Sequence, residues 1–164
     1  MKSINGNKSC INVAHWNGGS SHLGKSSKGK EKLLHVKFLL NKFNIDVFGL
    51  SEANLHKSVN NLEYKIDKYK VFHQDLNIAR VVTYVKEDLD CKVEESLMDP
   101  NIACVWLLIG RGRSRWLVGQ AYREHMVLGD KESSSSDSQI ERWRKLLDKV
   151  SQTEVSFWEY FQGS

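Results

Sequence analysis

Residues 9–16 read Ser-Cys-Ile-Asn-Val-Ala-His-Trp and continue into Asn17-Gly18-Gly19. Its alternating side chains and the glycines that follow predict a strand that ends in a turn. Residues 30–43 have the apolar spacing of a largely buried helix, and residues 45–50 form a short apolar run of strand length that ends at Ser51-Glu52. Strand, helix and strand make a βαβ unit, in which the carboxyl ends of two parallel strands meet at one edge of the sheet.

The rest of the chain continues as short strands and one more helix. The β-branched and aromatic content predicts strands at 69–73, 80–85, 103–109 and 116–122. An amphipathic helix is predicted over 138–151. The fold class is therefore α/β, a mixed β-sheet with the helices at 30–43 and 138–151 on one face.

Composition excludes several classes of protein. With 164 residues, 40% of them hydrophobic and 27% charged, the chain resembles an ordinary globular domain rather than a disordered or fibrous chain. No apolar run approaches the length of a membrane span or a secretory signal, so we expect an intracellular protein, nuclear or cytoplasmic. Its three cysteines form no CxxC pair, which argues against a disulfide framework or a zinc cluster and favours reduced core thiols.

Basic charge is concentrated at the front of the chain. The net charge is +4, but residues 1–45 contain eight lysines and a single acid, Glu31. Such a segment suggests a polyanionic partner such as nucleic acid or a nucleotide phosphate, although a solvated lysine-rich helix has the same composition.

The βαβ unit brings two polar residues together. Asn17 follows the first strand and Glu52 follows the second, so parallel pairing places an amide beside a carboxylate at the edge where α/β proteins bind ligands. One carboxylate with an amide beside it can hold Mg²⁺, with water and phosphate oxygens as the remaining ligands. The same residues are also compatible with a plain turn and an exposed glutamate.

Four segments occur in a recognisable order: 13–18, 45–55, 79–85 and 118–124. Together they resemble the N-terminal half of an endonuclease/exonuclease/phosphatase domain, closest to the endonuclease of non-long-terminal-repeat retrotransposons. The resemblance covers roughly residues 9–151 and implies half of a four-layer α/β/β/α sandwich, with Mg²⁺-dependent cleavage of DNA phosphodiesters as its chemistry. It implies that Asn17 belongs to the catalytic site, that Glu52 is the metal-binding glutamate, and that Tyr122 or Arg123 contacts phosphate.

Two motifs of that family are absent from this sequence, the Gly-Asp-x-Asn strand and the late Ser-Asp-His motif. Positioned acid and base groups each increase the rate of hydrolysis by about 10²–10⁴-fold. Without those motifs the sequence predicts weak or no cleavage. We therefore expect residues 1–156 to form a truncated, retrotransposon-type endonuclease-like domain. The alternative is a non-catalytic binding or self-assembly module of the same ancestry.

Two further features are basic. Residues 19–26 match GxxxxGK[ST], so Lys25 and Ser26 could address phosphate and Mg²⁺ in a small P-loop nucleotide-binding protein, the second alternative. The turn at 110–115 between two predicted strands carries Arg111, Arg113 and Arg115, which could contact a phosphate backbone. DNA is therefore a possible partner, and no membrane is expected.

Two expectations concern the ends of the fold. Residues 157–164 look in part like an engineered protease-cleavage linker and are left out of the functional argument. A half sandwich would leave one apolar sheet face open, which predicts a homo-oligomer or a protein partner that covers it.

Overall fold

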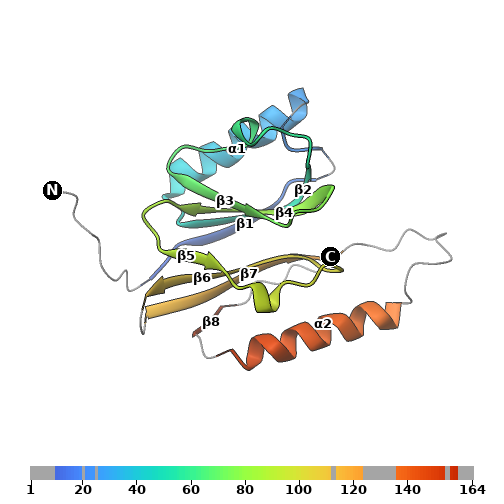
Figure 1. Ribbon diagram of the computed structural model, residues 1–164. Coiled ribbons are helices and arrows are strands. Elements are labelled where there is room, and N and C mark those ends of the chain that lie inside the picture. The colour runs from blue at the N-terminus through green and yellow to red at the C-terminus, as the bar shows by residue number, and fades with distance from the viewer. Residues whose placement is uncertain are drawn as a thin grey trace.

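The computed structural model describes residues 10–19, 21–24, 26–111, 114–123, 136–153 and 156–158. Its strands and helices are shown in Figure 1. In order they are β1 (Val13–Asn17), α1 (Ser27–Phe43), β2 (Val47–His56), the 3₁₀ helix η1 (Asn61–Glu63), β3 (Tyr69–His73), β4 (Ile78–Lys86), β5 (Cys91–Val93), the 3₁₀ helix η2 (Glu95–Leu97), β6 (Ala103–Arg111), β7 (Ser114–Tyr122), α2 (Ser136–Ser151) and β8 (Ser156–Trp158).

The first sheet has the strand order β1-β2-β4-β3. β1 and β2 are parallel, with Asn17 opposite Ser51, while β4 runs antiparallel to both of its neighbours. The predicted βαβ unit is therefore confirmed. Because strand side chains alternate between the two faces, Phe48 and Leu50 of β2 pack with Val36 and Leu40 of α1 in the outer core of this sheet.

Both ends of α1 are capped by side-chain or backbone geometry. The Ser26 hydroxyl accepts a hydrogen bond from the Gly29 amide at 3.0 Å, which satisfies one of the open donors of the first turn. Asn44 takes a left-handed conformation (φ 49°) and its amide donates to the Leu40 carbonyl. The helix thus begins three residues before the predicted start at 30 and ends where the sequence predicted.

The second sheet has the strand order β5-β6-β7-β8. β6 and β7 form the predicted antiparallel hairpin, and β8 adds to β7 in parallel. α2 covers the outer face of this sheet, where Leu146 and Val150 pack with Cys104 and Leu117. Residues 157 and 158, which the sequence analysis set aside as part of a tail, belong to β8.

The two sheets face each other. Their inner faces share one apolar core that contains Val47, Val81, Val85, Val105, Leu107, Ile109 and Val118. The layers therefore follow the order α1, first sheet, second sheet, α2 (Figure 1). The prediction of one mixed sheet with both helices on one face is wrong, because the strands after β4 form a second sheet that carries α2 on its own outer face.

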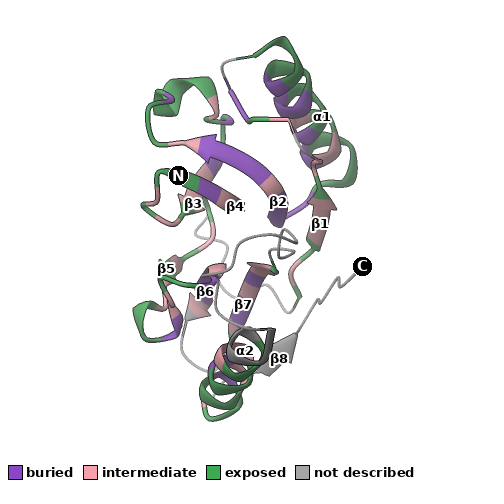
Figure 2. Ribbon diagram, turned by 90° about the vertical axis from the view of Figure 1, so that its right-hand side faces the viewer, coloured by how far each residue is buried: buried purple, intermediate pink, exposed green. Residues whose placement is uncertain are grey.

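The burial of residues follows this layering. Buried residues are most frequent in β2 and β4, whereas the outward sides of both helices are exposed (Figure 2). The inner face of the first sheet is covered by the second, so the open face that motivated the expectation of a partner is closed. The homo-oligomer or partner stays a prediction.

Of the cysteines, Cys104 is buried as predicted, whereas Cys10 is exposed, and all three are free thiols. Among the described residues, no helix is long and apolar enough to cross a membrane.

Candidate functional site

Three polar side chains from three strands meet at Glu52. The Asn17 Nδ2 donates a hydrogen bond to Glu52 Oε1 at 3.1 Å. The Tyr122 hydroxyl, at the end of β7 in the other sheet, donates to the same oxygen at 3.1 Å. The sequence-predicted residues Asn17, Glu52 and Tyr122 are thus brought together, although Tyr122 is 70 residues from Glu52 in the chain.

The backbone of β2 is strained at this point. Glu52 and Asn54 have φ angles of 51° and 48°, and the pairing of β2 with β4 shifts its register between Ser51 and Leu55. Asparagine tolerates the left-handed region, but a glutamate there is uncommon. Strain of this kind clusters at functional sites, where the surrounding structure holds it in place. Glu52, which is half-buried, therefore lies where the regular pairing of β2 with β4 is interrupted.

A buried lysine lies beneath this strained segment. Lys32 of α1 is only 3% exposed, and its ammonium donates to the carbonyls of Gly19 at 3.1 Å, of Glu52 at 3.0 Å, and of Ser21. Burial lowers the pKa of Lys32, and the nearby Glu52 carboxylate partly offsets that by raising it. Lys32 therefore joins the loop after β1 to the backbone of Glu52.

The chemistry of the donor set fits Mg²⁺. Both hydrogen bonds to Glu52 fall on Oε1, and Oε2 accepts none from the described residues. The Asn17 Oδ1 accepts from the Gly19 amide at 3.0 Å while its Nδ2 donates to Glu52, so Asn17 helps to fix the orientation of the carboxylate. A single oriented carboxylate suits Mg²⁺, which keeps several waters and takes phosphate oxygens as further ligands. Within the described ranges no three His, Cys, Asp or Glu side chains group closely enough to hold a metal by themselves.

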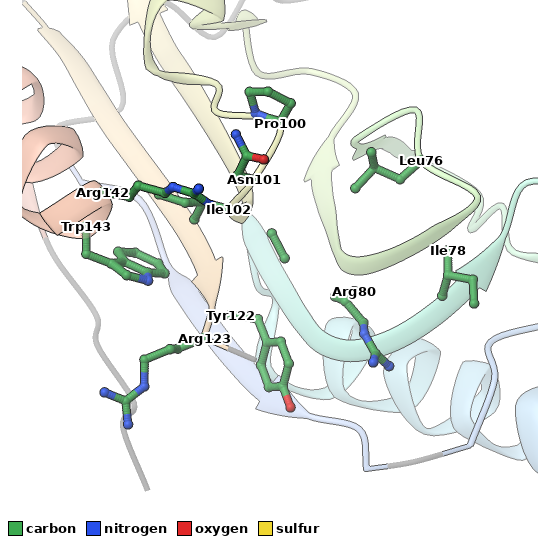
Figure 3. Close-up of a pocket in the computed structure, with 11 residues that line it drawn as sticks. Leu76, Ile78, Arg80, Pro100, Asn101, Ile102, Tyr122, Arg123, Arg142 and Trp143 are labelled. Carbon is green, nitrogen blue, oxygen red and sulfur yellow. The ribbon is translucent and has the colours of Figure 1, made fainter. Parts of the chain in front are cut away.

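A pocket of about 220 Å³ lies beside this cluster. It lies between the start of β4, the segment before β6, the end of β7 and α2 (Figure 3). The described residues that line it are Leu76, Ile78, Arg80, Pro100, Asn101, Ile102, Ala103, Tyr122, Arg123, Arg142 and Trp143. Tyr122 belongs to both the pocket and the Glu52 cluster, so the two are continuous.

The other sequence-predicted residues are spread over the molecule. Arg123 follows Tyr122 and lines the pocket. Arg115 is exposed near the turn end of β7, seven residues and therefore about 24 Å along the strand from Tyr122. Arg115 is consequently not part of the Glu52 cluster. Arg111 is placed only by its backbone in β6, and Lys25 and Arg113 lie outside the described residues.

The described part of the GxxxxGK[ST] segment serves the fold. Leu23 is fully buried in the core around α1, and its amide donates to the Ala53 carbonyl. The Ser26 hydroxyl caps α1, and the carbonyls of Gly19 and Ser21 point at the Lys32 ammonium. Carbonyls that surround a cation are the reverse of the amide cradle that phosphate requires. Nucleotide binding at this loop stays a prediction.

Sequence reasoning missed Lys32, Arg80 and Arg142. Lys32 carried a signal, because it stands on the same helix face as the buried Leu33 and Val36, where a solvated lysine does not belong. Arg80 and Arg142 carried no such signal in the sequence. Arg80 lies in an ordinary predicted strand, and Arg142 lies in a predicted amphipathic helix. Trp143, predicted as core, is half-buried and lines the pocket as well as packing beneath α2.

The sequence matches no protein-family model and no curated protein. Among solved structures, the chain is similar to the endonuclease domain of TRAS1, a telomere-specific non-LTR retrotransposon. The two share 16% sequence identity with a TM-score of 0.48, over 79% of this chain and 51% of that one. The chain thus spans about half the length of that structure.

Proposed function

We propose that the chain is an endonuclease-like domain of retrotransposon type, which binds a DNA phosphodiester through Mg²⁺ held by Glu52 and cleaves it slowly. The observation that carries the proposal is the convergence of Asn17 and Tyr122, from two different sheets, on one oxygen of a glutamate in a strained conformation. Convergent donors and stored strain are typical of sites where a side chain must hold one orientation.

Each side chain has a distinct task in this proposal. Glu52 would hold the metal through its carboxylate, whose plane is fixed by the donors on Oε1. Lys32 holds the Glu52 carbonyl and so fixes the backbone that carries the carboxylate. Arg123, beside Tyr122, contacts the phosphate backbone. Bound Mg²⁺ would supply Lewis-acid stabilisation of the phosphoryl charge.

Slow cleavage follows from what the cluster contains. Its titratable side chains are Glu52 and Tyr122, and no group of three His, Cys, Asp or Glu side chains forms among the residues described. Among the described residues the cluster offers no base positioned to activate water, and such a base accelerates hydrolysis by about 10²–10⁴-fold. This same observation favours the second candidate, a non-catalytic binding module of the same ancestry.

The test is nicking of supercoiled plasmid by folded protein in Mg²⁺ or in EDTA. We expect slow, Mg²⁺-dependent nicking by the unaltered protein and its loss in Glu52→Gln, which keeps the size of the side chain but removes its charge. The matched control is Glu63→Gln, since Glu63 is an exposed glutamate of η1. Equal nicking by the Glu52→Gln protein contradicts the proposal. Mg²⁺-dependent DNA binding without nicking, lost only in Glu52→Gln, assigns the binding module instead.

A further inference from the structure

The pocket beside Glu52 combines two kinds of wall. Arg80, Arg123 and Arg142 supply three guanidinium groups, and the described lining contains no carboxylate. The remaining lining is apolar or aromatic, apart from Asn101. Figure 3 shows Arg142 and Trp143 entering from α2, with Leu76 and Ile78 on the opposite side. Such a pocket suits a ligand that is both anionic and flat.

One wall of the pocket, the segment that leads into β6, is held in place by the Gln74 side chain. Gln74 Nε2 donates to the carbonyls of Asp99 and Ile102, both at 3.0 Å, and Gln74 Oε1 accepts from the Cys104 amide at 3.1 Å. These bonds tie the segment between β3 and β4 to the segment that enters β6. The Asn101 amide is fixed in turn by Asp99 Oδ1 at 2.8 Å. This wall is therefore preformed, which lowers the entropy cost of binding.

Two residues connect the pocket to the Glu52 cluster. Tyr122 lines the pocket and donates to Glu52. Arg80 lines the pocket and donates to Asn54 Oδ1, two residues beyond Glu52 on the strained strand. A phosphate at Glu52 thus has its neighbouring nucleoside within reach of the pocket.

We propose that this pocket binds one unpaired nucleoside phosphate unit, so that the substrate class of the site is single-stranded or locally unpaired nucleic acid. The inference rests on the proposed function, because it takes the phosphate at Glu52 as the neighbouring group. Guanidinium groups match phosphate oxygens with paired hydrogen bonds, and a base stacks on an aromatic side chain whatever its sequence. At about 220 Å³ the pocket is smaller than the roughly 300–1,000 Å³ of drug-sized sites, which suits a single nucleoside.

Fluorescence anisotropy of a short labelled oligonucleotide tests this proposal, with EDTA present so that Glu52 and its metal play no part. The three arms are the single strand, the duplex of the same sequence, and unlabelled deoxyadenosine monophosphate as competitor. The variants are Arg142→Ala and its matched control Arg144→Ala. Arg144 is an exposed arginine of α2, paired with Glu141 and absent from the pocket lining. Both variants remove one positive charge from the same helix.

We expect the single strand to bind more tightly than the duplex. Arg142→Ala should weaken single-strand binding about five- to tenfold and reduce the slope of log K against log salt by about 0.7, whereas Arg144→Ala changes affinity less than twofold. Arg123→Ala, at an exposed position, repeats the test if Arg142→Ala fails to fold. Competition by the free nucleotide supports the pocket and identifies a free nucleotide as a second source of the same group.

Equal effects of Arg142→Ala and Arg144→Ala, or tighter binding of the duplex, overturn the proposal. Because these measurements contain no metal, either result leaves the Mg²⁺-dependent nicking and its dependence on Glu52 untouched. The proposals for the pocket and for the metal site can therefore be refuted independently.

Discussion

Replacement of the buried Lys32 by methionine tests how strongly the strained segment is held. The ammonium makes three hydrogen bonds to carbonyls, and bonds that involve a charged group contribute about 1.5–3 kcal/mol each. Against this, the methionine no longer has to bury a charge, and the carbonyls of the half-buried Gly19 and Ser21 can be rehydrated. We therefore expect Lys32→Met to reduce the free energy of unfolding by about 2–4 kcal/mol.

Urea denaturation followed by circular dichroism measures this change. In thermal unfolding of a chain of this size, a stability change of about 1 kcal/mol shifts the melting temperature by about 2–4 °C. The melting temperature of Lys32→Met should therefore fall by roughly 5–15 °C. Lys30→Met is the matched control, because Lys30 lies exposed on the same helix and surface substitutions usually stay within about 0.5 kcal/mol. If Lys32→Met changes stability no more than Lys30→Met, the three carbonyl contacts do not hold the segment and the reasoning is refuted.

Three further predictions concern other parts of the fold. The free energy of unfolding of Glu52→Gly, measured by urea denaturation, should stay within about 1 kcal/mol of that of the unaltered protein. The glycine removes backbone strain of about 1–2 kcal/mol, and this offsets the loss of two hydrogen bonds. A loss above about 3 kcal/mol contradicts the strain argument. Burial lowers the pKa of His15, so the unfolded chain takes up the proton more readily and stability falls as pH drops through about 6.5. His15→Gln should flatten urea midpoints between pH 7.5 and 5.5, and an unchanged slope would refute this. Gly49→Ala would place a Cβ 2.4 Å from the Gln120 side chain and should cost about 1–3 kcal/mol, partly restored by Gln120→Ala in a double-mutant cycle; additive effects would contradict the clash.

The βαβ unit could be predicted from the sequence because its signals are local. The alternation before Asn17, the glycine turn and the helix spacing each lie within a few residues, and the parallel crossover then brings Asn17 to Glu52 without further information. The site half that lies on β1 and β2 follows from that topology. The resemblance implied only that Tyr122 belongs to the site, and its contact with Glu52 came from the structure.

The division into two sheets could not be predicted, because it depends on pairings between distant strands. The predicted strands at 80–85 and 103–109 are both apolar, yet the first belongs to β4 and pairs with β2, whereas the second belongs to β6 in the other sheet. Local patterns give the strand and its faces but not its neighbour. The pocket was hidden for the same reason, since Arg80 and Arg142 come from different layers.

The site depends on how the two sheets are held against each other, since Glu52 belongs to one and Tyr122 to the other. The sheets are joined by a buried polar contact, in which the Thr83 hydroxyl donates to Gln120 Oε1 at 2.7 Å. Gln120 fits there because Gly49, paired with Thr83 in the first sheet, has no side chain to occupy the space. Gln120 is two residues before Tyr122 on β7, so the contact that fixes the sheets also fixes the register at which the Tyr122 hydroxyl reaches Glu52. Apolar packing alone is not directional, whereas this hydrogen bond forms only at one relative position of the two strands.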